Sequence, residues 1–336
     1  MNQPLESLAN DLSNALNASA NPRLARELLT AAIGLVRDQP ATLDLKIASA
    51  ALREMREAFS AFAPYRGQRK VTVFGSARTA SHDPLYDQAR TVSRLLADDG
   101  WMIVTGAGPG IMHAAMEGAG RERSFGVNIR LPFEQGANSV IAGDGKLVSM
   151  KYFFTRKLML MKESQAFVSM PGGFGTLDET FELITLTQTG KGAPVPIVFL
   201  EVPGYAYWDR VHEFVTTQVI DNGYASKQDT DLYAITEDPV EALRYIRHFY
   251  RRYHSVRYVG DWLYIRLLSA PTVAQLTDLN RRFADLCVSG SIVLASAHAG
   301  EVADADNIDL PRIRLRFNRQ AHGRLRQLIN ALNDLD

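Results

Sequence analysis

Residues 166–179 read "AFVSMPGGFGTLDE", a short apolar run, then Pro171 with three glycines, then the start of a helical pattern. Such a stretch is typical of a buried strand that turns sharply into a helix. Other apolar runs share this character, with helix-like stretches between them: "KVTVFGS" (70–76), "WMIVTG" (101–106), "SFGVNI" (124–129), "PIVFLE" (196–201) and "DLYAITED" (231–238). Continuous apolar strands alternating with helices predict an α/β fold, a Rossmann-like parallel sheet with helices on both faces.

The patterns that flank this region differ from it and predict three domains. Residues 67–252 form the Rossmann-like nucleotide-binding domain. Residues 253–336 form a small α+β C-terminal domain, in which "SVRYVGDWLYIRLL" makes two strands around a tight turn. Residues 1–66 form a helical N-terminal arm that packs either on its own core or on a partner subunit. Apolar residues at helical spacing mark the arm: Leu24, Leu28, Ala32, Leu35 and Val36.

Composition narrows the classes of function. The 336 residues include 37 basic and 37 acidic side chains, which argues against a nucleic-acid-binding protein or a polybasic membrane face. No run reaches the roughly 18 apolar residues of a membrane span, and the first basic residue is Arg23, which argues against a signal peptide. The single cysteine, Cys287, fits a reducing compartment, so we expect a cytoplasmic protein. Cys287 lies in an apolar helical pattern and is predicted to be buried.

Three glycine-bearing stretches fall at the predicted carboxyl ends of strands: "FGSAR" (74–78), "TGAGPGIMH" (105–113) and "PGGFGTLDE" (171–179). In an open parallel sheet such ends meet at one crevice, where main-chain N–H groups at helix starts bind anions. A P-loop is absent, because neither Gly-Lys pair precedes Ser or Thr. The dinucleotide fingerprint also fails, since Ile111 stands where its third glycine belongs. The anion is therefore expected to be a mononucleotide phosphate rather than NAD.

Two structural alternatives stay open at this point. Thr176 and Glu179 have the spacing of a capping box, which would give both residues a purely local role. Arg156 and Lys157 lie on a helix-like segment and are either a solvated helix face or a phosphate clamp at the crevice.

Together these motifs resemble a known family. "PGGFGTLDE" resembles the PGGxGTxxE signature of the LOG-type phosphoribohydrolases, often labelled lysine decarboxylase-like, and "FTRK" resembles their Arg-Lys element. The resemblance covers about residues 68–225. It implies a Rossmann-like enzyme, a homodimer or higher homo-oligomer, that hydrolyses the N-glycosidic bond of nucleoside 5′-monophosphates, a purine such as AMP in particular. It implies no cofactor and no metal, and a nucleotide rather than nucleic acid or membrane as the partner.

The resemblance also assigns residues. Arg156 and Glu179 match the family's catalytic arginine and glutamate, whereas His113 is left out of the catalytic set as a structural group. The matching substrate-binding residues are Gly172, Gly173, Gly175, Thr176 and Lys157, with Ser76, Gly106 and Gly108 at the same mouth and Glu134 and Thr185 as further contacts.

A competing interpretation is a nucleotide-binding carrier or sensor of the same fold that does not hydrolyse its ligand. The second loop here is Gly-Ala-Gly, and the short plant-type members lack the N-terminal arm and the C-terminal domain. These departures leave the preferred base and any regulation open.

Overall fold

The computed structural model describes residues 5–130 and 136–336, with side chains from residue 11 onward. The chain divides into two compact units, Met1–Arg56 and Glu57–Asp336. The first unit holds helices α1 (Leu5–Asn17), α2 (Pro22–Arg37) and most of α3 (Thr42–Phe62). Helix α2 begins where the Asn21 side chain accepts a hydrogen bond from the Leu24 N–H and Pro22 fills the first helical position. The predicted N-terminal arm is therefore helical.

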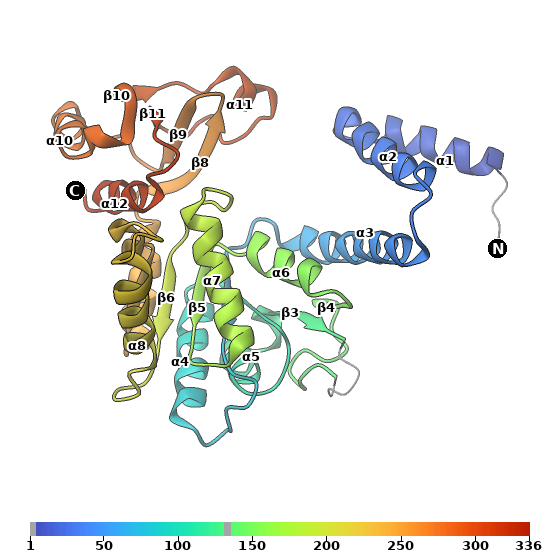
Figure 1. Cartoon of the computed structure of the whole chain (residues 1–336), viewed down its shortest axis with the longest axis horizontal. Coiled ribbons are helices and arrows are strands. Elements are labelled where there is room, and N and C mark those ends of the chain that lie inside the picture. Colours follow the sequence, from blue (N-terminus) through green and yellow to red (C-terminus); the bar gives the residue numbers. More distant parts are fainter. Residues whose placement is uncertain (1–4, 131–135) are drawn as a thin grey trace. The chain divides into compact units, whose positions relative to one another are not determined.

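The second unit is built on a seven-stranded sheet in which every neighbouring pair is parallel. Its strand order is β4-β3-β2-β1-β5-β6-β7. Figure 1 labels β3, β4, β5 and β6 of this sheet. The strands are β1 (Lys70–Phe74), β2 (Met102–Thr105), β3 (Ser124–Ile129), β4 (Leu147–Met150), β5 (Ala166–Ser169), β6 (Ile197–Leu200) and β7 (Tyr233–Thr236). The predicted α/β fold class is confirmed, and so is the strand within 231–238. Strand β4 was not predicted.

Helices cover both faces of this sheet, so β1, β2, β5 and β6 are buried along their whole length. The α-helices are α4 (Pro84–Asp98), α5 (Ile111–Ala119), α6 (Phe153–Lys162), α7 (Phe174–Gln188), α8 (Tyr207–Phe214) and α9 (Pro239–Phe249). Shorter helical turns are η1 (Ala63–Tyr65), η2 (Arg121–Arg123), η3 (Val215–Ile220) and η4 (Lys227–Leu232). None of the described helices combines the length and the apolar character that crossing a bilayer requires.

The strand order reverses beside β1. Strands β2 to β4 follow on one side of β1, whereas β5 to β7 follow on the other. The loops after β1 and β5 therefore leave neighbouring strands at the same edge of the sheet. This is the position at which open α/β sheets bind ligands.

The C-terminal part carries a four-stranded antiparallel sheet of order β10-β11-β9-β8. Its strands are β8 (Tyr253–Val259), β9 (Trp262–Leu267), β10 (Cys287–Ala295) and β11 (Arg312–Phe317), and its helices are α10 (Val273–Phe283), η5 (Ala284–Leu286), α11 (Ala299–Ala303) and α12 (His322–Asn333). The predicted α+β pattern is confirmed. The helical, buried assignment of Cys287 is wrong, because α10 ends at Phe283 and Cys287 opens β10 half-buried.

Helix α12 ties the antiparallel sheet to the rest of the second unit. The Asn333 side chain accepts hydrogen bonds from the main-chain N–H groups of Arg252 and Tyr253 and donates one to the Phe249 carbonyl. The buried Arg326 guanidinium donates to the carbonyl of Val195 at 2.9 Å. These contacts cross the predicted boundary after residue 252, and both predicted domain boundaries remain predictions.

Candidate active site

Main-chain atoms of Ser76 join the three glycine-bearing loops. The Ser76 N–H donates to the carbonyl of Pro171 at 3.3 Å, and the Ser76 carbonyl accepts from the Ile111 N–H at 3.0 Å. The first contact links the loop after β1 to the loop after β5. The second links it to the start of α5, which follows the second glycine loop. The structure therefore brings the three predicted loops to one edge of the sheet.

The loop after β5 folds back over the side chain of Thr176. A Cβ atom added at Gly172 would overlap the Thr176 hydroxyl, so this position requires glycine. Helix α7 begins at Phe174, with Gly173 at its N-cap and no capping side chain among the described residues. The capping-box interpretation is wrong, because Thr176 is already the third residue of the helix. Gly173 and Gly175 are exposed, which leaves the main chain of the first turn open to an anion.

Arg156 on α6 reaches the second glycine loop. Its Nε donates to the carbonyl of Val127 at 3.1 Å, and a Cβ atom at Gly106 would overlap its Nη2. Gly106 is buried, and Arg156 is half-buried. The interpretation of Arg156 as part of a solvated helix face is therefore wrong. Glycine at position 106 leaves room for the guanidinium beside the loop.

Glu179 lies on the buried face of α7, together with Thr176 and Thr180. Its exposed fraction is 7%, and its Oε2 atom is buried without a hydrogen-bond partner in the described part of the chain. Burial raises the pKa of the Glu179 carboxyl from 4.5 to about 7, against the lowering influence of the Arg156 and Lys157 charges. A carboxyl with a pKa near neutrality can accept a proton during a reaction, and its unpaired oxygen is available to a reactant.

Lys157 is the next residue along α6, and it forms ion pairs with two carboxylates of α7. Its Nζ lies 2.9 Å from Asp178 Oδ2 and also contacts Glu182. The side chain is 17% exposed, so Lys157 is not part of a solvated face either. Its predicted contact with substrate remains a prediction, since the structure shows this cation already neutralised.

Of two further predicted contacts, Thr185 does not join the glycine loops. Thr185 is exposed, and its hydroxyl donates to the Phe181 carbonyl at 2.8 Å. Twelve residues separate Thr185 from Gly173, a distance of about 18 Å along a helix axis. The predicted contact Glu134 lies outside the described residues.

The second glycine loop is held by polar side chains beneath it. Asn138 Nδ2 donates to the Gly108 carbonyl at 3.1 Å, and Gly108 is half-buried. His113 at the start of α5 lies 3.3 Å from the Tyr86 hydroxyl and 3.6 Å from Glu117, as expected of a structural group.

Within residues 5–130 and 136–336, no three His, Cys, Asp or Glu side chains are placed to hold a metal.

Tyr207 is a candidate that the sequence patterns did not reveal. Its hydroxyl donates to the Gly172 carbonyl at 2.8 Å and so braces the phosphate loop. The buried Glu201, just after β6, accepts hydrogen bonds from the N–H groups of Tyr207 and Trp208 and thereby fixes the start of α8. The position of Glu201 in the sequence could have indicated these residues, because Glu201 ends an apolar strand at the edge of the sheet where the glycine loops lie.

Comparison with known proteins agrees with this geometry. The family model described as "Possible lysine decarboxylase" matches residues 110–246. The cytokinin riboside 5′-monophosphate phosphoribohydrolase LOG2 of Arabidopsis thaliana is 26% identical over 163 residues, 47% of this chain and 73% of that protein. A cytokinin riboside 5′-monophosphate phosphoribohydrolase of Mycobacterium tuberculosis is 27% identical over 53% of this chain and 93% of its own length.

A third relative is the probable cytokinin riboside 5′-monophosphate phosphoribohydrolase LOG6 of Arabidopsis thaliana. It is 30% identical over 141 residues, which make up 41% of this chain and 68% of that relative. This similarity spans more than two thirds of LOG6 and accompanies the glycine loops, Arg156 and Glu179 described above. The chain belongs to the LOG family, whose relatives named here are phosphoribohydrolases.

Proposed function

We propose that this protein hydrolyses the N-glycosidic bond of nucleoside 5′-monophosphates, with AMP or another purine nucleotide as substrate. The observation that carries the proposal is Glu179, a buried carboxyl with a pKa of about 7 and an unpaired oxygen beside a phosphate-type loop. A carrier that only binds a nucleotide has no need for such a group. The relatives named above act on nucleotides of the same general class.

In this proposal the 5′-phosphate binds the open main chain at Gly173 and Gly175, where the dipole of α7 favours an anion. That contact fixes the ribose relative to Glu179, which lies less than two turns further along the same helix. The Arg156 guanidinium, held against Gly106, supplies positive charge for the phosphate or the ribose hydroxyls.

Cleavage of the glycosidic bond passes through a state with positive charge at C1′. The ionised Glu179 stabilises that charge and accepts a proton from the attacking water. The new C1′–O bond replaces the C1′–N bond, whose electron pair leaves with the base. The proton that Glu179 accepts balances the proton that the base nitrogen gains, so the products are free base and ribose 5-phosphate.

The test is a base-release assay with AMP, GMP, CMP and UMP. Release of a free base together with an equal amount of ribose 5-phosphate supports the hydrolase. The control is Glu179→Gln, which keeps the shape of the side chain but cannot accept the proton. Tight nucleotide binding with no release from any of the four would contradict hydrolysis and support the carrier or sensor.

We also propose that the chain is a homodimer through helices α6 and α7, which lie side by side (Figure 1). A groove of about 480 Å³ between them is lined by Phe153, Phe154, Lys157, Leu158, Met161, Asp178, Glu182 and Leu186. Several of its apolar side chains are exposed, Phe153 by 55% and Leu158 by 44%. Exposed apolar patches of this kind are typical of subunit interfaces.

Light scattering tests the dimer against the chain mass of 37.3 kDa. Leu158→Asp places a charge in the groove and is expected to lower the mass of the particle. The exposed Val240 of α9, far from this groove in sequence, offers the control Val240→Asp, which is expected to leave the mass unchanged. A wild-type protein that is monomeric at micromolar concentration would contradict the proposal.

A further inference from the structure

Helix α2 of the N-terminal arm carries an apolar face that no described residue of its own unit covers. Leu28 is 56% exposed, Leu24 49% and Leu35 37%, and no residue of α2 is buried. A surface helix of a globular protein normally turns such a stripe toward a core. The arm therefore presents an apolar surface that stays open within the first unit.

The spacing along α2 is that of a coiled-coil seam. Leu24, Leu28, Ala31 and Leu35 follow one another at intervals of four, three and four residues, which are alternating a and d positions of a heptad. We call these four residues the α2 seam. At about 100° per residue they form one narrow stripe, whereas Ile33 lies on the opposite side of the helix. In coiled coils, a seam of this period packs against a second helix.

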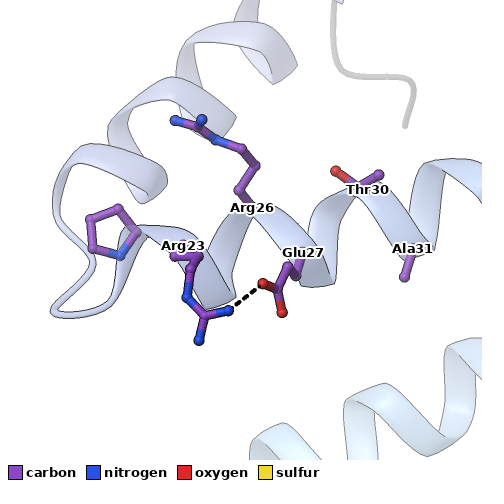
Figure 2. A pocket seen from close by; sticks show the side chains of 6 residues that line it. Arg23, Arg26, Glu27, Thr30 and Ala31 are labelled. Atoms are coloured by element: carbon purple, nitrogen blue, oxygen red, sulfur yellow. Dashed lines mark hydrogen bonds and ion pairs between the residues drawn. The ribbon is translucent and has the colours of Figure 1, made fainter. Parts of the chain in front are cut away.

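The surroundings of the seam are open, and one of their two arginines is paired with their one glutamate. A hollow of about 690 Å³ runs along α2 and meets the seam at Ala31, with Pro22, Arg23, Arg26, Glu27 and Thr30 as its other lining residues (Figure 2). Arg23 and Glu27 pair with each other at 2.8 Å on the same helix. This charge pair is satisfied within the helix, so the border of the seam does not call for a strongly charged partner.

We propose that the α2 seam packs against the α2 seam of a second copy of this chain. Residues 1–56 contain six basic and six acidic side chains, a balance that disfavours an anionic membrane or nucleic acid as the partner. A neutral apolar stripe of heptad period is self-complementary, as the two-fold pairing of identical subunits requires. The contact uses different helices from the α6–α7 groove, so both together build an assembly larger than a dimer.

The experiment measures the mass of the full-length protein in solution by sedimentation or light scattering. The seam variant carries Leu28→Glu and Leu35→Glu, and the matched control is Ile33→Glu, at a position 50% exposed on the other side of α2. The seam variant is expected to have half the wild-type mass, while the control keeps it. An unchanged mass of the seam variant overturns the proposal, whether another protein, a membrane or the chain's own α3 covers the seam.

A milder variant guards against loss of the helix itself. Leu28→Ala with Leu35→Ala keeps residues that favour helix, and it is expected to raise the dissociation concentration of the assembly by at least about tenfold. If the assembly of this variant dissociates at the same protein concentration as that of the wild type, the proposal is overturned. Base release per subunit is expected to stay unchanged in all of these variants, which separates this contact from the proposed function.

Discussion

Replacing Glu179 by glutamine separates the role of this carboxyl in catalysis from its effect on the stability of the folded protein. The pKa of Glu179 rises from 4.5 to about 7, which corresponds to roughly 3–4 kcal/mol at about 1.4 kcal/mol per unit. Between pH 4.5 and about 7 the folded protein holds a proton on Glu179 that the unfolded chain has released. Stability therefore falls as the pH rises through this window, and above it the folded state carries a buried charge at full cost.

Glutamine removes that charge. At pH 8 we expect Glu179→Gln to raise the free energy of unfolding by about 1–3 kcal/mol, less than the full amount because the amide also loses hydration. This gain in the free energy of unfolding is expected to become smaller as the pH is lowered toward 5. Turnover of the nucleotide is expected to fall by at least ~10²-fold, with binding retained. In the wild type, turnover should increase with pH through about 7, as Glu179 ionises.

Urea unfolding at pH 5 and pH 8 measures the stability, and the base-release assay measures the turnover. Glu213→Gln is the matched control, because it makes the same chemical change at an exposed carboxylate of α8, outside the glycine loops and the groove. It is expected to give no stabilisation and less than about a tenfold loss of rate. A Glu179→Gln protein that is destabilised at pH 8, or that turns over at nearly the wild-type rate, would refute the reasoning.

Three other substitutions test the loops. The added Cβ of Gly172→Ala should push against the Thr176 hydroxyl and raise the KM for the nucleotide by at least about tenfold. The control is Gly67→Ala, whose added Cβ meets nothing within 4 Å and should leave the kinetics unchanged. Equal effects of the two substitutions would argue against a tight fit at Gly172. Gly106→Ala should displace the Arg156 guanidinium and lower kcat/KM by about 10–100-fold, and wild-type kinetics would show that this contact is dispensable. Arg156→Lys keeps the charge but loses the planar fork, so steady-state kinetics should show weaker binding and slower turnover, and an unchanged kcat/KM would remove Arg156 from the site.

Much of the fold could be predicted, because its strands are continuous apolar runs. Strand β1, for example, is buried at all five positions, as expected of a strand in a parallel sheet covered on both faces. Strand β4 escaped prediction because its four residues alternate between buried and half-buried at the end of the sheet, which gives only a weak signal. Cys287 was misplaced because a single turn, η5, separates α10 from β10, and apolar residues continue through it.

The site could be predicted in its residues but not in its contacts. The glycines and the Arg-Lys element point to an anion site, yet the sequence left the start of α7 open, since the local capping signal at Thr176 competes with a helix that begins at Phe174. The contact of Arg156 with Gly106 joins residues 50 positions apart and depends on the packing of α6 beside β3. Ion pairing of Lys157 likewise follows from two helices meeting, which no local pattern reports.

The hydrogen bonds of Asn333 have a consequence for biosynthesis. Its single side chain satisfies the main chain at Phe249, Arg252 and Tyr253, the segment where the parallel sheet gives way to the antiparallel one. Until residue 333 has emerged from the ribosome, those three polar groups have no such partner, and the join between the sheets cannot close. The junction between the two sheets must therefore wait for helix α12, and a product cut short before that asparagine would expose this junction to proteases.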